Sequence, residues 1–202
     1  MRAILLLLIF ISSVGFGQDK YIDSLRQERK IKQEHLQDAE GGVLTPADLK
    51  DFKSVDYFDV DTNFRIKATW TIDKGKKFKM PTSTEREPIY RRFGYITFSI
   101  NSLEYRLTVY QNMELRKKKG FKNYFFIPFR DETSGITTYG GGRYIDTYIH
   151  KKDTVLEIDF NQCYNPYCAY SHRYSCPIPP SENTLEVEVN AGEKTPIYHQ
   201  EH

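Results

Sequence analysis

Hydrophobic and polar residues alternate with a period of two over much of the chain. Residues 64–72 place Phe, Ile, Ala, Trp and Ile on one side and Arg, Lys and Thr on the other, which is the pattern of a strand with one buried face. Residues 95–100 and 103–110 repeat it on either side of Asn101-Ser102, which predicts a β-hairpin. An aromatic run predicts a strand at 123–129, and apolar residues at alternate positions predict further strands at 144–149, 154–160 and 185–189.

The part of the chain before these strands has helical signals instead. Asp19–Glu40 is highly charged and carries a thin apolar stripe at helical spacing, so it predicts an exposed helix that ends in a left-handed cap at Gly41-Gly42. Thr45 and Pro46 are typical of the N-cap and first position of a second helix. Because tight turns separate the strands, the predicted fold class is mainly β (α+β), an antiparallel β-barrel or sandwich with an N-terminal helix and a short second helix.

A hydrophobic run precedes the charged helix. Arg2 is followed by the apolar residues 3–11 and then by a segment with small residues near Gly17, which is typical of a secretory signal peptide cleaved after Gly17. The run is too short for a comfortable membrane span, so we expect cleavage rather than retention as an anchor, and no stable membrane insertion afterwards. The sequence thus predicts an exported protein, soluble in the periplasm or outside the cell.

These patterns divide the chain into four parts. We expect a signal peptide at 1–17, a charged helix at 18–42, a single β-rich domain at 43–194 and a C-terminal tail at 195–202. A length of 202 residues fits one large domain, and the many aromatic and β-branched residues can supply its core. Wholesale disorder is therefore not expected.

Net charge argues against one class of partner. The formal charge of the chain is +2, and the predicted signal peptide contains one of its 29 basic residues and none of its 27 acidic ones, which leaves +1 for the mature protein. A protein that binds the phosphates of nucleic acid usually carries a strong basic excess. We therefore expect no nucleic acid among its partners.

Four motifs in the second half of the chain have an order and spacing that resemble a known family. They are Phe129-Arg130-Asp131-Glu132-Thr133-Ser134-Gly135; Thr138-Tyr139-Gly140-Gly141-Gly142-Arg143-Tyr144; Asp159-Phe160-Asn161 with Tyr164-Asn165-Pro166-Tyr167-Cys168-Ala169-Tyr170; and Cys176-Pro177 with Pro179-Pro180-Ser181-Glu182-Asn183 and Ala191-Gly192-Glu193-Lys194. On these residues the chain resembles the bacterial family of uncharacterised proteins known as domain of unknown function 1684. The resemblance implies one continuous domain and almost nothing about activity.

The first two motifs contain candidate binding residues. Asp131 and Thr133 precede a turn, and Tyr139, three glycines and Arg143 follow it. Glycines let backbone amides approach a ligand, and an arginine offers a forked donor to carboxylate or phosphate, so the segment predicts a site for a small polar or anionic ligand. The alternative is a glycine-rich connection in which Arg143 forms a structural ion pair with Asp131 or Asp146.

All three cysteines lie close together in the sequence. With one histidine they have the ligand types of a structural zinc site, although their spacing differs from established zinc knuckles: Cys163, Cys168, His172 and Cys176. Because thiols pair in an oxidising compartment, we predict a disulfide between Cys168 and Cys176 and no metal, with free thiols or a metal as the alternatives. Cys163 is expected to be a small buried residue.

Polar and aromatic residues next to these cysteines complete the predicted site: Asp159, Asn161, Tyr164 and Asn165. Aromatic faces beside amide and carboxylate groups suit a small polar ligand, and the same groups can also fasten a long loop to a β-domain. We therefore expect a protein that binds a small polar or anionic ligand at one end of its β-rich domain. The sequence identifies no cofactor.

Two alternative functions stay open. One is a hydrolase-like enzyme that uses the same pocket, and its candidate groups are Asp131, Arg143, Asp159 and His172. The other is a structural or partner-binding periplasmic protein whose charged N-terminal helix makes the contact. Because the common hydrolase motifs are absent, the sequence does not decide whether the protein is an enzyme.

Overall fold

The structure, a computed structural model, describes residues 3–38 and 40–198 and divides into two units, residues 1–44 and 45–202. Helix α1 (Ala3–Gln37) makes up most of the first unit and includes most of the predicted signal peptide. Residues 1, 2 and 199–202, which belong to the predicted signal peptide and tail, lie outside the described residues. Within the described part of the chain, no helix is long and apolar enough to cross a membrane.

The end of α1 differs from the prediction. The helix stops at Gln37, and neither Gly41 nor Gly42 has a positive φ, so the predicted left-handed cap is wrong. The N–H of Gly42 instead donates to the carbonyl oxygen of Asp38 at 2.8 Å. A Cβ atom at residue 42 would lie 2.4 Å from that same oxygen, so glycine is needed here for close approach rather than for backbone handedness.

The predicted second helix is present but short. Helix α2 spans Asp48–Asp51, so Pro46 precedes it and does not occupy its first position. The N-cap is Ala47, so the predicted N-cap role of Thr45 is wrong. Thr45 and Asp48 instead bond reciprocally: Oγ1 of Thr45 accepts from the N–H of Asp48 at 3.1 Å, and the Asp48 carboxylate accepts from the N–H of Thr45 at 2.8 Å.

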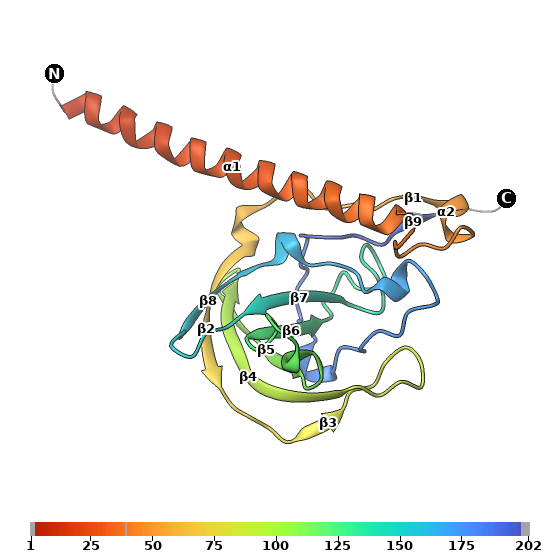
Figure 1. Cartoon of the computed structure of the whole chain (residues 1–202). Coiled ribbons are helices and arrows are strands. Elements are labelled where there is room, and N and C mark those ends of the chain that lie inside the picture. Colours follow the sequence, from red (N-terminus) through yellow and green to blue (C-terminus); the bar gives the residue numbers. More distant parts are fainter. Residues whose placement is uncertain (1–2, 39, 199–202) are drawn as a thin grey trace. The chain divides into compact units, whose positions relative to one another are not determined.

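An antiparallel, strongly curved sheet forms a half-barrel in the second unit (Figure 1). Its strands lie in the order β7-β6-β5-β4-β2-β8, with β3 paired to β4 beside this path. The strands are β2 (Arg65–Ile72), β3 (Lys77–Lys79), β4 (Ile89–Ile100), β5 (Leu103–Asn112), β6 (Tyr124–Phe129), β7 (Arg143–Tyr148) and β8 (Val155–Asp159). A separate short pair joins β1 (Phe52–Ser54) to β9 (Ile197–Tyr198). The predicted mainly β, antiparallel fold class is therefore confirmed.

Short 3-10 helices connect or follow these strands. They are η1 (Thr62–Phe64), η2 (Leu115–Lys117), η3 (Phe160–Gln162), η4 (Tyr167–Ala169) and η5 (Ser181–Asn183). Three of them lie after β8, where the chain has little regular structure and packs against the sheet. Phe160, Cys163, Leu185, Val189 and Ala191 from this region join the same buried cluster as Trp70, Ile96, Leu107 and Ile127 from the strands.

The alternating pattern correctly predicted β2, β4, β5, β7 and β8, and the aromatic run correctly predicted β6, but the predicted strand at 185–189 is wrong. Leu185 and Val189 are buried as the pattern requires, yet the segment forms no ladder. The N–H of Leu185 donates to Arg130, whereas the carbonyl oxygen of Val189 accepts from the side chain of Arg143 at 2.8 Å. The carbonyl oxygen of Val187 still accepts from the N–H of Glu132 at 3.2 Å, so the side chain of Arg143 takes the place of a backbone partner only from Val189 onward.

Candidate functional site

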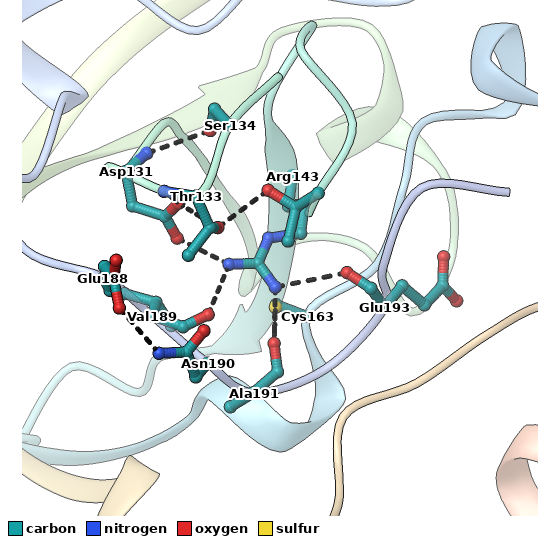
Figure 2. Close-up of polar contacts among 11 residues, drawn as sticks. Asp131, Thr133, Ser134, Arg143, Cys163, Glu188, Val189, Asn190, Ala191 and Glu193 are labelled. Atoms are coloured by element: carbon teal, nitrogen blue, oxygen red, sulfur yellow. Dashed lines mark hydrogen bonds and ion pairs between the residues drawn. The ribbon is translucent and has the colours of Figure 1, made fainter. Parts of the chain in front are cut away.

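Arg143, at the start of β7, lies at the centre of the predicted binding segment with 1 % of its surface exposed (Figure 2). Its Nη2 donates to Oδ2 of Asp131 at 2.5 Å and to the carbonyl oxygen of Val189 at 2.8 Å. Its Nη1 donates to the carbonyl oxygens of Ala191 and, at 3.2 Å, of Glu193. The guanidinium group therefore binds one carboxylate and three backbone carbonyls of the protein itself.

The carboxylate of Asp131 is also satisfied within the fold. Its Oδ1 accepts from the N–H and the hydroxyl of Thr133 at 2.9 and 2.5 Å. The Thr133 hydroxyl in turn lies 2.8 Å from that of Thr138. Asp131 thus forms the ion pair with Arg143 that the sequence offered as the structural alternative.

Gly142 lets the chain enter β7 beside this cluster. Of the three successive glycines only this one has a positive φ, 88°, and a Cβ there would lie 2.6 Å from the carbonyl oxygen of Phe129. The glycine is therefore needed for backbone conformation and close packing.

Asp159 and Asn161 fasten a distant loop. The Asp159 carboxylate accepts from the N–H and Nδ2 of Asn161, both at 3.0 Å. The Asn161 amide then pairs with the backbone of Asp61, accepting from its N–H at 3.0 Å and donating to its carbonyl oxygen at 2.8 Å. These contacts match the loop-fastening alternative.

Asn165 belongs to a buried cluster around Glu193, a residue that the sequence analysis did not select. Oε2 of Glu193 accepts from the N–H of Asn165 at 2.7 Å and from the hydroxyl of Tyr170 at 2.6 Å. Nδ2 of Asn165 donates to the carbonyl oxygen of Lys194 at 2.7 Å. Arg143 and Asn165 therefore hold the same segment, 189–194, from two directions. The only signal for Glu193 in the sequence was its place in the last family motif.

Tyr164 and Tyr139, the remaining predicted site residues, have separate partners. The Tyr164 hydroxyl donates to Oδ2 of Asp146 at 2.6 Å. The Tyr139 hydroxyl lies 4.0 Å from Sγ of Cys168. The eight predicted binding residues therefore lie in several internal networks rather than around one pocket, and their binding of a ligand stays a prediction.

Cys168 and Cys176, the predicted disulfide partners, are free thiols that lie next to each other. Sγ of Cys176 accepts a hydrogen bond from the N–H of Cys168 at 3.2 Å. Hydrogen bonds from the Cys176 thiol, Ser83 and Tyr139 to the Cys168 sulfur lower the pKa of Cys168 to about 6. The same hydrogen bond, together with burial, raises the pKa of Cys176.

Cys163 lies in a different environment from these two cysteines. It is 1 % exposed, which confirms the expected small buried residue, and burial raises its pKa to about 11. Its thiol donates to the carbonyl oxygen of Ala191 at 3.4 Å. Within residues 3–38 and 40–198 no three His, Cys, Asp or Glu side chains are grouped as metal ligands would be.

The four hydrolase-like candidates do not meet in one site. Asp131 and Arg143 form the buried ion pair, and Asp159 holds Asn161. His172 is exposed.

A cavity of about 500 Å³ lies elsewhere in the β-domain, at the side of the sheet where β3 pairs with β4. We call it the Tyr110 cavity. It is lined by Gly75, Lys76, Phe78, Pro81, Arg92, Tyr110, Ile178, Pro179, Pro180 and Glu182. None of the eight predicted binding residues lines it, although its rim contains the Pro179-Pro180 and Glu182 of the fourth family motif.

Aromatic, proline and charged side chains meet in the Tyr110 cavity. The rings of Phe78 and Tyr110 pack edge to face with centroids 5.9 Å apart. The Tyr110 hydroxyl donates to Oε1 of Glu182 at 2.6 Å, and burial together with this carboxylate raises the pKa of Tyr110. Arg92 forms a surface ion pair with Asp73 at 3.1 Å.

Comparison with known protein families identifies the family of this domain. The sequence profile of the family described as "Protein of unknown function (DUF1684)" matches residues 50–194. The chain belongs to this family. The match confirms the resemblance seen in the four motifs, whereas the bacterial origin of the DUF1684 family stays a prediction. No curated protein matches the chain.

One solved structure is similar to this DUF1684 protein over most of its length. It is the solution NMR structure of an uncharacterized protein from gene locus rrnAC0354 of Haloarcula marismortui. The two chains are 28% identical with a TM-score of 0.67, and the similarity covers 89% of this chain and 96% of the other. Since the family is described as of unknown function and this relative as uncharacterized, the comparisons identify a family and a fold but no activity.

Proposed function

We propose that this protein binds a small organic anion in the Tyr110 cavity. The observation that carries the proposal is a hollow of about 500 Å³ with aromatic and proline walls and two cationic side chains. Small-ligand sites typically enclose about 300–1,000 Å³ and combine apolar walls with a few polar groups. The ligand class is the one the sequence predicted, whereas the residues are different.

The charges and the aromatic lining of the Tyr110 cavity favour a ligand with a carboxylate and a flat apolar group. Among the lining side chains, Lys76 and Arg92 are positive and Glu182 is negative, and Glu182 already accepts a hydrogen bond from Tyr110. Because Arg92 also pairs with Asp73, Lys76 is the cation on which the preference for an anion over an amine depends. The rings of Phe78 and Tyr110 would cover the apolar part of such a ligand.

Benzoate is a suitable probe for this proposal. We expect it to bind the purified protein in equilibrium dialysis or NMR titration, and Lys76→Glu to weaken binding about tenfold through loss of one attraction and gain of one repulsion. Lys77→Glu is the matched control, because Lys77 makes the same charge change one residue away without lining the cavity. Binding should be close to normal in this control.

Two results would contradict ligand binding in the Tyr110 cavity. One is equal loss of benzoate binding in both lysine variants, which would mean a general charge effect. The other is the absence of any thermal shift with a panel of small carboxylates, combined with native mass spectra that show no retained small molecule.

We also propose that the protein is exported after cleavage behind Gly17, as the N-terminal pattern of Arg2 and residues 3–11 predicts. Export would place Cys168 and Cys176 in an oxidising compartment, where a disulfide between them is expected. N-terminal sequencing of protein from the native cell should begin at Gln18 in the exported fraction. A protein that keeps its first residues and stays with the cytoplasmic fraction would contradict export.

A further inference from the structure

Cys168 and Cys176 are arranged asymmetrically within one polar cluster. Cys176 is 8 % exposed and is held by the 81–83 segment, because its N–H donates to Oγ of Ser83 at 3.1 Å and its carbonyl oxygen accepts from the N–H of Ser83 at 2.9 Å. Cys168 is the middle residue of a single 3-10 turn, η4, and is half-buried. Cys168 is therefore the more exposed of the two residues.

We propose that Cys168 and Cys176 form a redox-active dithiol that exchanges with disulfides, in which Cys168 is the attacking thiol and Cys176 the resolving thiol. This inference is independent of the Tyr110 cavity. It also goes beyond a structural disulfide, because a structural bridge needs neither an accessible sulfur nor hydrogen-bond donors around it.

Hydrogen-bonding groups lie close to the sulfur that would attack. The Tyr139 hydroxyl is 4.0 Å from Sγ of Cys168, and the N–H of Cys168 donates to Sγ of Cys176 at 3.2 Å. Hydrogen bonding by the side chains of Cys176, Ser83 and Tyr139 lowers the pKa of Cys168. Hydrogen bonds of this kind stabilise a thiolate, which is the nucleophilic form of cysteine. The lowered pKa of Cys168 agrees with this geometry, and the raised pKa of Cys176 keeps the second sulfur protonated until the first has reacted.

The exchange balances with a low-molecular-weight disulfide, R–S–S–R, as the oxidant. The Cys168 thiolate attacks one sulfur, the S–S bond breaks, and one RS⁻ leaves and takes up a proton. Cys176 then loses its proton to solvent and attacks Sγ of Cys168, which releases the second RS⁻. The two protein thiols lose two electrons and form a disulfide, and R–S–S–R becomes two RSH.

The test uses the reduced full-length protein and dithiodipyridine, a small disulfide that releases a coloured thione. We expect wild type to release two equivalents and to lose two hydrogen masses without keeping an adduct. Cys176→Ser should release one equivalent and keep the pyridylthio group on Cys168. Cys168→Ser should lose the fast phase, whereas Cys163→Ala, which changes the buried thiol, should behave as wild type.

The reaction rate at low pH provides a second measurement. At pH 5.5 an ordinary thiol is about 0.1% thiolate, whereas a pKa of about 6 leaves roughly a quarter of Cys168 as thiolate. Lower basicity reduces the reactivity of each thiolate by about tenfold. We therefore expect Cys168 to react at least tenfold faster than a short cysteine peptide at pH 5.5.

The proposal is overturned if wild type ends with two stable adducts, or if Cys168→Ser reacts as fast as wild type. It also fails if Cys168 reacts no faster than the peptide at pH 5.5. A Cys168–Cys176 disulfide that excess glutathione does not reduce in the folded protein would show a structural bridge, and this result too would overturn the exchange.

Discussion

The side chain of Arg143 replaces part of a β-ladder. In an extended chain the carbonyls of every second residue point to the same side, and Val189, Ala191 and Glu193 have this spacing. A guanidinium group has donors enough to reach all three and still pair with Asp131. One buried cation thus holds the irregular segment against the sheet.

Removing this side chain should be costly. Arg143→Ala leaves the Asp131 carboxylate buried without its cation and three carbonyls without a donor, so we expect the free energy of unfolding to fall by about 3–5 kcal/mol in urea titrations. Arg65→Ala is the control, because it breaks an exposed pair with Glu157 that is worth about 0–1 kcal/mol. Equal effects of the two substitutions would contradict the role given to Arg143.

At the scale of the elements, the turn of the β4–β5 hairpin and the short ladder between β5 and β6 each depend on particular residues. Strands β4 and β5 pair from Ile100 and Leu103 outward, and both residues between them have positive φ, 51° and 66°. On the other side of β5 the ladder with β6 is short, and its register, Tyr110 with Phe126, would next pair Thr108 with Pro128. Because proline has no N–H, this ladder needs another donor.

The hairpin turn should be improved by glycine. Ser102→Gly removes the cost of a side chain at a φ of 66°, so we expect a gain of about 0.5–1 kcal/mol in the free energy of unfolding. Ser99→Gly, at an exposed position within β4, should have the opposite sign, because glycine weakens a regular strand. A loss of stability with Ser102→Gly would argue against the positive φ of this turn.

Asn183 supplies the hydrogen-bond donor that Pro128 lacks. Its Oδ1 accepts from the N–H of Thr108 at 2.7 Å, and its Nδ2 donates to the carbonyl oxygens of Thr108 at 2.9 Å and Pro128 at 2.7 Å. Asn183→Ala leaves these buried groups unpaired, and we expect a loss of about 2–4 kcal/mol by urea unfolding. Asn190→Ala removes one exposed contact to Glu188 and should change stability by less than about 0.5 kcal/mol. If both asparagine variants were equally stable, the bridging role would be wrong.

The whole molecule consists of a helical unit and a β-unit, and the β-unit has its own cores. The main buried cluster draws its members from residues 64–191, and a second cluster joins Met80, Tyr90, Tyr110 and Phe126 to Cys176. A region with a self-contained core is able to fold alone.

A fragment of residues 45–202 should therefore fold. We expect cooperative urea unfolding and a β-type far-ultraviolet circular dichroism spectrum from it. A fragment of residues 75–202 is the control, because it lacks β2, which lies between β4 and β8, and should not fold. Unfolding of the longer fragment without cooperativity would contradict the independence of this unit.

The predictable part of the fold was the part with a local pattern. Ala68 and Trp70 alternate with polar residues because one face of β2 is buried, and Asn101-Ser102 between two alternating runs identifies a turn. The same rule failed at 185–189. The alternation there shows which side of the segment is buried, but it does not show which groups the backbone bonds to. Glu193 and Asn183 were missed because a buried polar side chain has no periodic signal.

The sequence by itself determined the mainly β fold class, the hairpin at Asn101-Ser102 and the four motifs of the DUF1684 family. Only the tertiary structure decided that Arg143 is bound by the protein's own carbonyls, that Cys168 and Cys176 lie side by side, and that the Tyr110 cavity lies away from the predicted residues. The physical reason is that the residues of a site lie far apart along the chain. Periodicity reports which side of an element is buried, whereas a site joins residues of separate elements, and their meeting depends on how the sheet curves and packs.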